Sequence, residues 1–171
     1  MQFELAKWDV SHIPTLVVNA NDARIGRFLR DSFPYPYTAG AAKNFIDAVL
    51  NTPGEIFRAI VSEGAAVGGI SVTRGRDVYR RSAEIGYWLA PAYWGRGIMT
   101  EAVRRICAYT FAETDIVRIY AEVFSPNTAS QRVLEKCGFG KEGVKRRSVF
   151  KNGEFFDSVV YALLKPEEQA N

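Results

Sequence analysis

The hydrophobic residues of this chain fall into stretches with the period of a strand and stretches with the period of a helix. Alternating or continuous apolar runs that are bounded by turn residues are typical of strands. Apolar residues that recur every three or four positions are typical of amphipathic helices. Strands are predicted at residues 3–8, 56–62, 65–73, 83–90 and 117–124, and helices at residues 98–111 and 127–137.

Before the second of these strands, the pattern predicts helices that are separated by an aromatic loop. Residues 11–33 have helical spacing that breaks near Asn21 and Asp22, either of which can cap a second helix. The segment "FPYPYT" at residues 33–38 is predicted to be a loop, because each proline restricts itself and the residue before it. Thr38 is expected to cap a further helix that ends at "NTPGE". Its predicted apolar positions are Ala42, Phe45, Ile46, Val49 and Leu50.

The C-terminal part of the chain predicts a β-hairpin. Asn152 and Gly153 stand between two alternating runs within residues 144–164, and Asn-Gly favours a two-residue hairpin turn. The order strand, helix, strand, helix, hairpin implies a mixed sheet with helices on its faces. The 171 residues contain no repeat or low-complexity linker, so one domain over residues 1–171 is predicted.

Composition and charge narrow the class of protein. The chain is 47% hydrophobic and has a formal net charge of +3, which is too small to argue for nucleic-acid binding by itself. Cys107 and Cys137 lack zinc-type spacing, which favours a reduced protein without a metal. His12 is the single histidine and is expected to be a surface or capping residue. The start of the chain does not resemble a signal peptide, and no apolar run approaches membrane-spanning length, so a cytoplasmic location without a membrane partner is expected.

The segment "PAYWGRGIMTEAV" at residues 91–103 is the first candidate for chemistry. Gly95 and Gly97 flank Arg96 between a predicted strand and a predicted helix. Glycines allow a close approach to the backbone, and a helix N-terminus offers N–H groups and a partial positive charge. This arrangement suits a phosphate or pyrophosphate. It also suits an ordinary tight turn, because a lone Gly-x-Gly motif has low specificity.

Longer segments show a more specific resemblance. The segments "AEIGYWLAPAYWGRGIMTEAV", "VRIYAEVFSPNTASQRVLEKCGF" and "FKNGEFFDSVVYALL", in this order, together with "FPYPYT", resemble the GNAT acetyltransferase superfamily in its RimJ/RimL-like (ribosomal-protein N-acetyltransferase) branch. The resemblance implies an α/β (α+β) single-domain fold, in which helices flank a mixed, mostly antiparallel sheet that is splayed between its fourth and fifth strands. It also implies that acetyl-CoA, without a metal, transfers its acetyl group directly to a primary amine that arrives from the opposite side.

The same resemblance assigns the residues that bind acetyl-CoA. The backbone of Trp88, Leu89 and Ala90 would pair with the pantetheine arm, and Asn127 would contact the CoA arm. Arg132, together with Lys136, either reaches the 3′-phosphate or belongs to a solvated helix face. Two positions depart from the family pattern, because Ala92 replaces the usual Gln or Arg and Leu134 replaces the usual proton-donating tyrosine. The residues that would surround the pyrophosphate are Trp94, Gly95, Arg96, Gly97, Ile98, Met99 and Thr100.

The candidates for catalysis lie on the predicted strands and on the helix after Asn127. Glu84 either draws the proton from the amine through water or is a structural carboxylate paired with an arginine at 74, 76, 80 or 81; Glu122 is the second-choice base. The Leu89 backbone N–H is the expected oxyanion donor. Ser130 either protonates the leaving thiolate or bonds its own helix. Cys137 is expected to be a small apolar residue.

The acceptor is expected to be a protein N-terminal amine or a small amine. Tyr35, Tyr37, Trp88 and Phe150 either line the acceptor groove or belong to the core. The cations Lys145, Arg146 and Arg147, and the lack of an evident acidic cluster, favour short peptides over spermidine.

Two functional alternatives to acetyl transfer and two further partners stay open at this point. One alternative is a catalytically silent CoA-binding sensor or scaffold, and another is a basic nucleic-acid-binding module, which lacks a recognisable motif. Relatives often form homodimers. No nucleic acid is expected as a partner beyond an association with the ribosome.

Overall fold

The computed structural model describes residues 2–166 and contains two compact units. Unit 1 consists of Met1–Ser71 and Gly86–Ala102, and unit 2 consists of Val72–Ile85 and Val103–Asn171. The chain passes from one unit to the other inside two strands and one helix. Each unit therefore contains a continuous part of the sheet.

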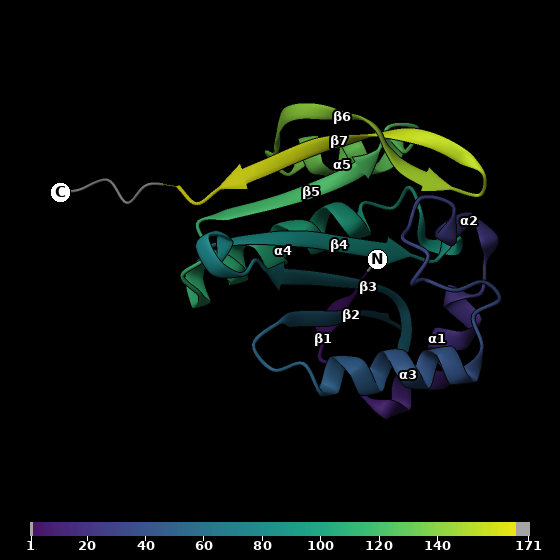
Figure 1. Cartoon of the computed structure of the whole chain (residues 1–171). Coiled ribbons are helices and arrows are strands. Elements are labelled where there is room, and N and C mark those ends of the chain that lie inside the picture. The colour runs from purple at the N-terminus through teal and green to yellow at the C-terminus, as the bar shows by residue number, and fades with distance from the viewer. Residues whose placement is uncertain (1, 167–171) are drawn as a thin grey trace. The chain divides into compact units, whose positions relative to one another are not determined.

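The strands form one seven-stranded sheet with the order β1-β2-β3-β4-β5-β7-β6. The pairs β1–β2, β5–β7 and β6–β7 are antiparallel, and β4–β5 is parallel. These pairings confirm the mixed, mostly antiparallel sheet that the sequence predicts. The strands are β1 (Glu4–Ala6), β2 (Ile56–Ser62), β3 (Ala65–Arg74), β4 (Ser82–Leu89), β5 (Arg118–Phe124), β6 (Gly140–Lys151) and β7 (Glu154–Leu164) (Figure 1).

The helices begin where the sequence provides capping side chains. Thr38 accepts a hydrogen bond from the Ala41 N–H and begins the third α-helix, as predicted. Asp22 rather than Asn21 caps the short second one. The α-helices are α1 (Ile13–Ala20), α2 (Ala23–Gly26), α3 (Ala39–Leu50), α4 (Ile98–Glu113) and α5 (Thr128–Lys136), and the 3₁₀ turns are η1 (Val10–His12), η2 (Asp77–Tyr79) and η3 (Pro91–Tyr93).

The single histidine has the capping role expected from the sequence. The Asp9 side chain accepts from the Ser11 N–H at 2.8 Å, and the Asp9 N–H donates to His12 Nδ1 at 3.1 Å. These bonds form a reciprocal capping box at the start of η1. His12 thus stabilises a helix start instead of serving as a catalytic base.

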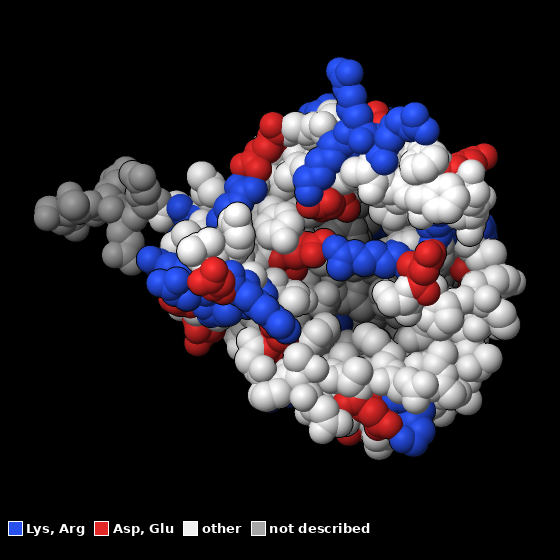
Figure 2. Space-filling view, in the orientation of Figure 1, with Lys and Arg blue, Asp and Glu red and all other residues white. Residues whose placement is uncertain are grey.

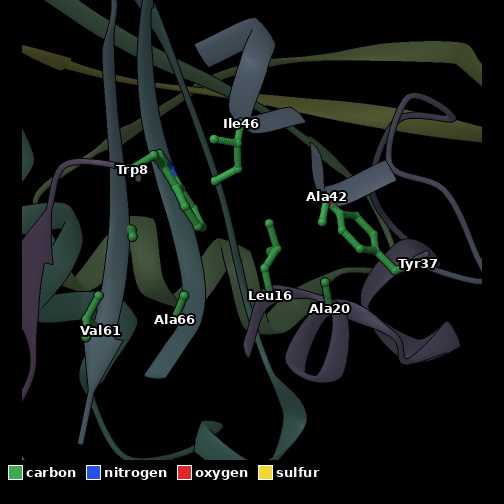
Figure 3. Close-up of a cluster of buried hydrophobic side chains, with 9 residues drawn as sticks. Trp8, Leu16, Ala20, Tyr37, Ala42, Ile46, Val61 and Ala66 are labelled. Atoms are coloured by element: carbon green, nitrogen blue, oxygen red, sulfur yellow. The ribbon is translucent and has the colours of Figure 1, made fainter. Parts of the chain in front are cut away.

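Unit 1 has a hydrophobic core between its helices and its strands. Leu16 of α1, Ile46 of α3 and Ala66 of β3 are fully buried, and Trp8 is 4% exposed (Figure 3). Burial of an aliphatic side chain of this size contributes roughly 1.5–3 kcal/mol. Of the apolar positions predicted for α3, Ala42 and Ile46 are fully buried, whereas Leu50, the last residue of the helix, is 56% exposed.

Unit 2 contains β5, β7, β6 and α5, together with the end of β3, the first half of β4 and most of α4 (Figure 1). Tyr161 of β7 and Leu134 of α5 are both almost fully buried. The Tyr161 hydroxyl donates to Glu135 Oε1 at 2.9 Å, so α5 covers the face of the sheet that carries Tyr161. The predicted hairpin is confirmed, because Asn152 and Gly153 have φ angles of 51° and 83° and connect β6 to β7.

Charged side chains of both signs are mixed on the face shown in Figure 2. Within residues 2–166, no helix has the length and hydropathy that crossing a membrane requires. In the same range, no group of His, Cys, Asp and Glu residues is suited to hold a metal ion.

Candidate active site

The glycine loop of unit 1, residues 94–97, has a backbone conformation that glycine favours. Gly95 and Gly97 have φ angles of 72° and 76°, and a Cβ atom built on either residue would meet no heavy atom within 4 Å. The space next to both residues is therefore open. The residues of the loop are exposed, whereas Ile98 and Met99, which follow it, are 2% and 8% exposed. Buried side chains thus anchor a loop whose own backbone is accessible.

Helix α4 begins directly after this loop. The Glu101 N–H donates to the Gly97 carbonyl at 3.1 Å, which is the first α-helical hydrogen bond. The N–H groups of a first helical turn have no partner within the helix and carry part of the positive end of the helix dipole. The loop therefore has the geometry of an anion site that consists largely of backbone groups.

Trp94 ties the glycine loop to the end of β4. Its indole Nε1 donates to the Leu89 carbonyl at 2.7 Å, and the Arg24 guanidinium lies 5.7 Å from the centre of its ring. The Arg96 guanidinium lies 5.5 Å from the centre of the Tyr93 ring. The loop is thus held by side-chain contacts at both Trp94 and Arg96.

The backbone of β4 directs alternate residues to opposite edges of the strand. The Gly75 N–H donates to the Ser82 carbonyl, and the Ala90 N–H donates to the Val67 carbonyl at 2.8 Å. Both bonds fit one antiparallel register between β3 and β4. In such a register, every second residue of β4 directs its backbone N–H and C=O groups to β3. By this alternation, Trp88 and Ala90 direct their backbone groups to β3, and Leu89 directs its own to the other edge.

The sequence predicts that the backbones of Trp88, Leu89 and Ala90 all pair with the pantetheine arm, and this stays a prediction. The Ala90 N–H is already bound by β3, so Leu89 is the residue whose backbone points to the other edge of β4. The Leu89 carbonyl accepts from Trp94, so its N–H is the group that remains suited to bind an oxyanion.

Two glycines of β3 explain how Trp88 is held. A Cβ atom on Gly68 would lie 2.6 Å from the Trp88 carbonyl oxygen, and a Cβ atom on Gly69 would lie 2.8 Å from the Trp88 indole Nε1. Both distances are too short for any larger residue. The sequence shows this pair of glycines but cannot show what lies against them.

Glu84 and Glu122 lie on the same face of the sheet in unit 2. Glu84 of β4 is paired with Tyr120 of β5 in the parallel ladder, and Glu122 follows two positions later. Residues that are paired, and residues two apart on one strand, point to the same side of a sheet. No acidic cluster is evident in the sequence, because the register that places these two glutamates on one face depends on the pairing of distant strands.

The two carboxylates have different surroundings. Glu122 is exposed and forms an ion pair with Lys145 of β6. Glu84 is half-buried. Of the arginines proposed as its structural partners, Arg74 and Arg81 also bind Asp115, and the Arg80 guanidinium donates to the Asp77 carbonyl. Glu84 is the less exposed of the two carboxylates, and its role as the base stays a prediction.

Asn127 begins α5, which carries the other candidate residues of unit 2. Its Oδ1 accepts from the Ser130 N–H at 3.2 Å, so Asn127 is the N-cap of the helix. Ser130 is half-buried and Arg132 is exposed. Leu134, at the position of the usual tyrosine, is fully buried and provides no hydroxyl.

Tyr161 is a hydroxyl that the sequence analysis did not consider. It lies under α5 and is 2% exposed. The pKa of its phenol is raised, mainly by burial and also by the hydrogen bond to Glu135. Because the hydroxyl already donates to a carboxylate, Tyr161 has a structural role.

The aromatic residues proposed for the acceptor groove have different environments. Tyr37 is a core residue at 4% exposure, and burial raises the pKa of its phenol to about 12. Phe33 contacts both Tyr37 and Trp88, with ring centres 5.1 and 5.6 Å apart. Tyr35 in unit 1 and Phe150 in unit 2 are each 61% exposed. These two are therefore the most exposed of the four residues, Trp88 is half-buried, and Tyr37 is better described as part of the core.

The two cysteines do not form a disulfide. Burial and, to a smaller extent, the neighbouring Cys137 raise the pKa of the Cys107 thiol to about 12. Cys137 is half-buried next to the end of α5. A thiol with a raised pKa is unreactive, which agrees with a packing role.

Comparison with known proteins gives the family. Residues 2–140 match the acetyltransferase (GNAT) domain family. The chain is 43% identical to the uncharacterised N-acetyltransferase YoaA of Bacillus subtilis over 88 residues. These aligned residues make up 52% of this chain and 50% of that protein. It is 25% identical to the spermidine N(1)-acetyltransferase of Escherichia coli over 140 residues, and the alignment covers 81% of this chain and 73% of that protein.

Solved structures extend the similarity over nearly the whole chain. The structure of the RimL ribosomal L7/L12 alpha-N-protein acetyltransferase in complex with coenzyme A superposes with a TM-score of 0.86 at 25% identity. That match covers 96% of this chain and 94% of that chain. In contrast, the chain spans only about half the length of the first curated relatives it matches. On the family match and this fold, the chain belongs to the GNAT acetyltransferase family.

Proposed function

We propose that this protein is an acetyl-CoA-dependent N-acetyltransferase that modifies primary amines. The observation that carries the proposal is the glycine loop, where exposed backbone and open space lie at the start of α4. A larger residue at Gly95 or Gly97 would place a side chain in this space. A pyrophosphate fits it because it needs N–H donors and room for a close approach.

The proposal assigns each chemical task to a residue of this chain. The loop backbone and Arg96 hold the phosphates of acetyl-CoA, and Asn127 and Arg132 contribute to binding the rest of CoA. Glu84 takes a proton from the substrate ammonium, directly or through water, which leaves a neutral amine. The neutral nitrogen attacks the thioester carbonyl, and the Leu89 N–H stabilises the oxyanion that forms. When the C–S bond breaks, the nitrogen loses a second proton to water, and CoA leaves as a thiolate, to which Ser130 can pass a proton from water.

Most of the rate is expected to come from positioning. Holding the amine and the thioester in line can contribute roughly 7–11 kcal/mol, whereas one oxyanion donor contributes about 3–4 kcal/mol. A serine is a weak acid, and a thiolate is a good leaving group, so the contribution of Ser130 is expected to be small. The burial of Leu134 in place of a tyrosine is compatible with such a mechanism.

Protein N-termini and compact amino-acid-like amines are the acceptors that we propose. The similarity to a ribosomal alpha-N-protein acetyltransferase supports this choice. Within unit 1 the ring of Tyr35, and within unit 2 the ring of Phe150, each expose apolar surface that suits a peptide. The similarity to a spermidine acetyltransferase favours the competing polyamine class, which the cations of β6 disfavour. A homodimer, an association with the ribosome and a cytoplasmic location stay predictions.

Release of the CoA thiol tests the proposed function. The protein would be incubated with acetyl-CoA and, in separate reactions, with N-terminal peptides, spermidine and aminoglycosides, and a thiol reagent would report turnover. We expect release above the hydrolysis background with at least one peptide, and at a lower catalytic efficiency with spermidine. Binding of acetyl-CoA without release for any amine would favour the catalytically silent sensor or scaffold.

A further inference from the structure

We propose that Lys145 is a specificity-determining residue that excludes diamines and polyamines by occupying the carboxylate to which their second ammonium group would bind. This inference rests on the proposed acetyl transfer and names the acceptors that the site rejects. It differs from simple repulsion by a basic edge, because it assigns the effect to one ion pair within unit 2.

The ion pair between Lys145 and Glu122 lies on the sheet face that carries the proposed base. Its two side chains are 52% and 32% exposed, so a ligand can reach both. Ser158 of β7 lies between them in the ladder: it is the register partner of Lys145, and its Oγ lies 3.5 Å from Glu122 Oε2. Ser158 is 1% exposed, and so this face has a well-packed floor beneath the ion pair.

Lys145 also lies within electrostatic range of Glu84. The pKa of its ammonium is raised, first by the hydrogen bond to Glu122 and then by the charges of Glu122, Tyr120 and Glu84. Glu84 is paired with Tyr120 across the β4–β5 ladder. The ammonium of Lys145 is therefore close to the carboxylate that is proposed to accept the substrate proton.

The backbone at Lys145 is fixed by an irregularity of β6. The register with β7 shifts between Lys145 and Val149, and Arg147 within this bulge has a φ angle of 49°. The Ser148 hydroxyl donates to the Lys145 carbonyl at 3.0 Å, and the Arg147 N–H donates to Asp157 Oδ1 at 2.7 Å. Bulges commonly re-aim a side chain next to an active site. Here Lys145 is the last residue paired in register before the bulge, and its pairing with Ser158 places it on the face of Glu122.

A tethered ammonium competes well with a free one. A diamine has one amine to be acetylated near Glu84 and a second ammonium that needs an anionic partner. Lys145 already supplies that ammonium to Glu122, and it pays none of the translational entropy that a free molecule loses on binding. A peptide N-terminus or a monoamine has no second ammonium group, so the ion pair between Lys145 and Glu122 does not weaken its binding.

The test compares a diamine with a monoamine of the same length. Lys145→Met removes the ammonium and keeps the apolar stem. Lys141→Met is the matched control, because Lys141 is an exposed lysine of the same strand whose register partner is Tyr161, on the face covered by α5. Binding of 1,4-diaminobutane and 1-aminobutane would be measured by calorimetry with CoA present, so that no turnover is required.

We expect Lys145→Met to bind 1,4-diaminobutane about fivefold more tightly than the wild type, which is the size of one partly exposed ion pair. The affinity for 1-aminobutane, and both affinities of Lys141→Met, should change by less than about twofold. In the double variant Lys145→Met, Glu122→Gln the gain should disappear. Equal diamine affinities in wild type and Lys145→Met, or a gain that survives Glu122→Gln, would overturn the proposal.

Two checks separate this inference from the proposed function. Lys145→Gln provides a second charge-neutral variant if Lys145→Met fails to fold, and the same gain is expected of it. The thiol-release assay tests catalysis independently of diamine binding. If the wild type releases no thiol with any amine, the proposed function fails, whereas the calorimetric comparison still decides whether Lys145 controls the binding of a second ammonium.

Discussion

The glycine loop of unit 1 and the charged sheet face of unit 2 offer a ligand different kinds of groups. The loop presents backbone, because Gly95 and Gly97 leave open space and no side chain of their own. The sheet face presents side chains, namely Glu84, Glu122 and Lys145, whose placement depends on strand register. The loop is suited to hold an anion that is the same for every acceptor, and the sheet face is suited to proton transfer and to selecting the acceptor.

This difference predicts two classes of mutational effect. Changes at the loop should alter acetyl-CoA binding and leave the choice of acceptor intact. Changes on the sheet face should alter the rate or the choice of acceptor and leave acetyl-CoA binding intact. The predictions below test this division, beginning with the largest expected effect.

Removal of the proposed base should give the largest effect on rate. Glu84→Gln is expected to lower kcat about 100-fold, or about 2.7 kcal/mol in the barrier, because the amine loses its proton acceptor. Steady-state kinetics with a peptide acceptor would measure this loss.

Glu122→Gln is the matched control for this change. Because Glu122 is bound by Lys145, its loss should change kcat for a peptide acceptor by less than about threefold. A large loss in Glu122→Gln together with normal turnover in Glu84→Gln would assign the base to Glu122 and contradict the assignment made from burial.

The next largest effect is expected from crowding of β3 against β4. It should lower the stability of the protein and not the rate of the reaction. Gly68→Ala is expected to cost about 2 kcal/mol in the free energy of unfolding, because its Cβ would lie 2.6 Å from the Trp88 carbonyl oxygen. Urea denaturation would measure this loss. Gly143→Ala is a suitable control, because a Cβ there meets no heavy atom within 4 Å and its φ is not positive. Equal stabilities of the two variants would contradict the close contact between Gly68 of β3 and the Trp88 carbonyl oxygen of β4.

Loss of the α5 cap should have a smaller effect with two measurable parts. Asn127→Ala removes the bond from the Ser130 N–H, which should lower the free energy of unfolding by about 1 kcal/mol. If Asn127 also contacts CoA, the Kd for acetyl-CoA should rise beyond what the variant's stability explains. Denaturation and calorimetry on the same protein separate the two roles. A loss of stability with unchanged affinity would leave Asn127 as a cap alone.

The exposed aromatic loop of unit 1 should have the smallest effect. Tyr35→Ala is expected to raise the KM of a peptide acceptor about threefold and to leave the KM of acetyl-CoA unchanged, because Tyr35 is 61% exposed and has little role in packing. Tyr37→Ala should instead lower stability, because that residue is part of the core. Kinetics and thermal melting of both variants would distinguish them. A raised acetyl-CoA KM in Tyr35→Ala would contradict an acceptor role.

Local signals in the sequence were sufficient to predict most elements. The caps at Thr38 and Asp22, the Asn152–Gly153 turn and the start of α4 after Gly97 all depend on residues next to each other in the chain. Such signals act through local sterics and hydrogen bonds, which a sequence displays directly. The glycine loop was predicted for the same reason.

The charged face of unit 2 could not be predicted in the same way. It requires the parallel pairing of Glu84 with Tyr120 and the bulge after Lys145, both of which depend on strands that are distant in the chain. The burial of Tyr37 likewise depends on Phe33 and the core around it. A shift of one residue in register would move each side chain to the other face, so charge patterns alone do not reveal the cluster.

The melting temperature with and without acetyl-CoA tests the glycine loop most directly. A ligand that binds only the folded protein stabilises it, by about 2.7 kcal/mol at 100 times its Kd. Gly97→Val and Gly54→Val form a matched pair, because both glycines have positive φ, at 76° and 88°, and neither Cβ would meet a heavy atom within 4 Å. Backbone strain is therefore similar in the two variants, and only Gly97 lies at the start of α4. We predict that acetyl-CoA raises the melting temperature of the wild type and of Gly54→Val but not that of folded Gly97→Val. A full shift in Gly97→Val would contradict the assignment of this loop to acetyl-CoA.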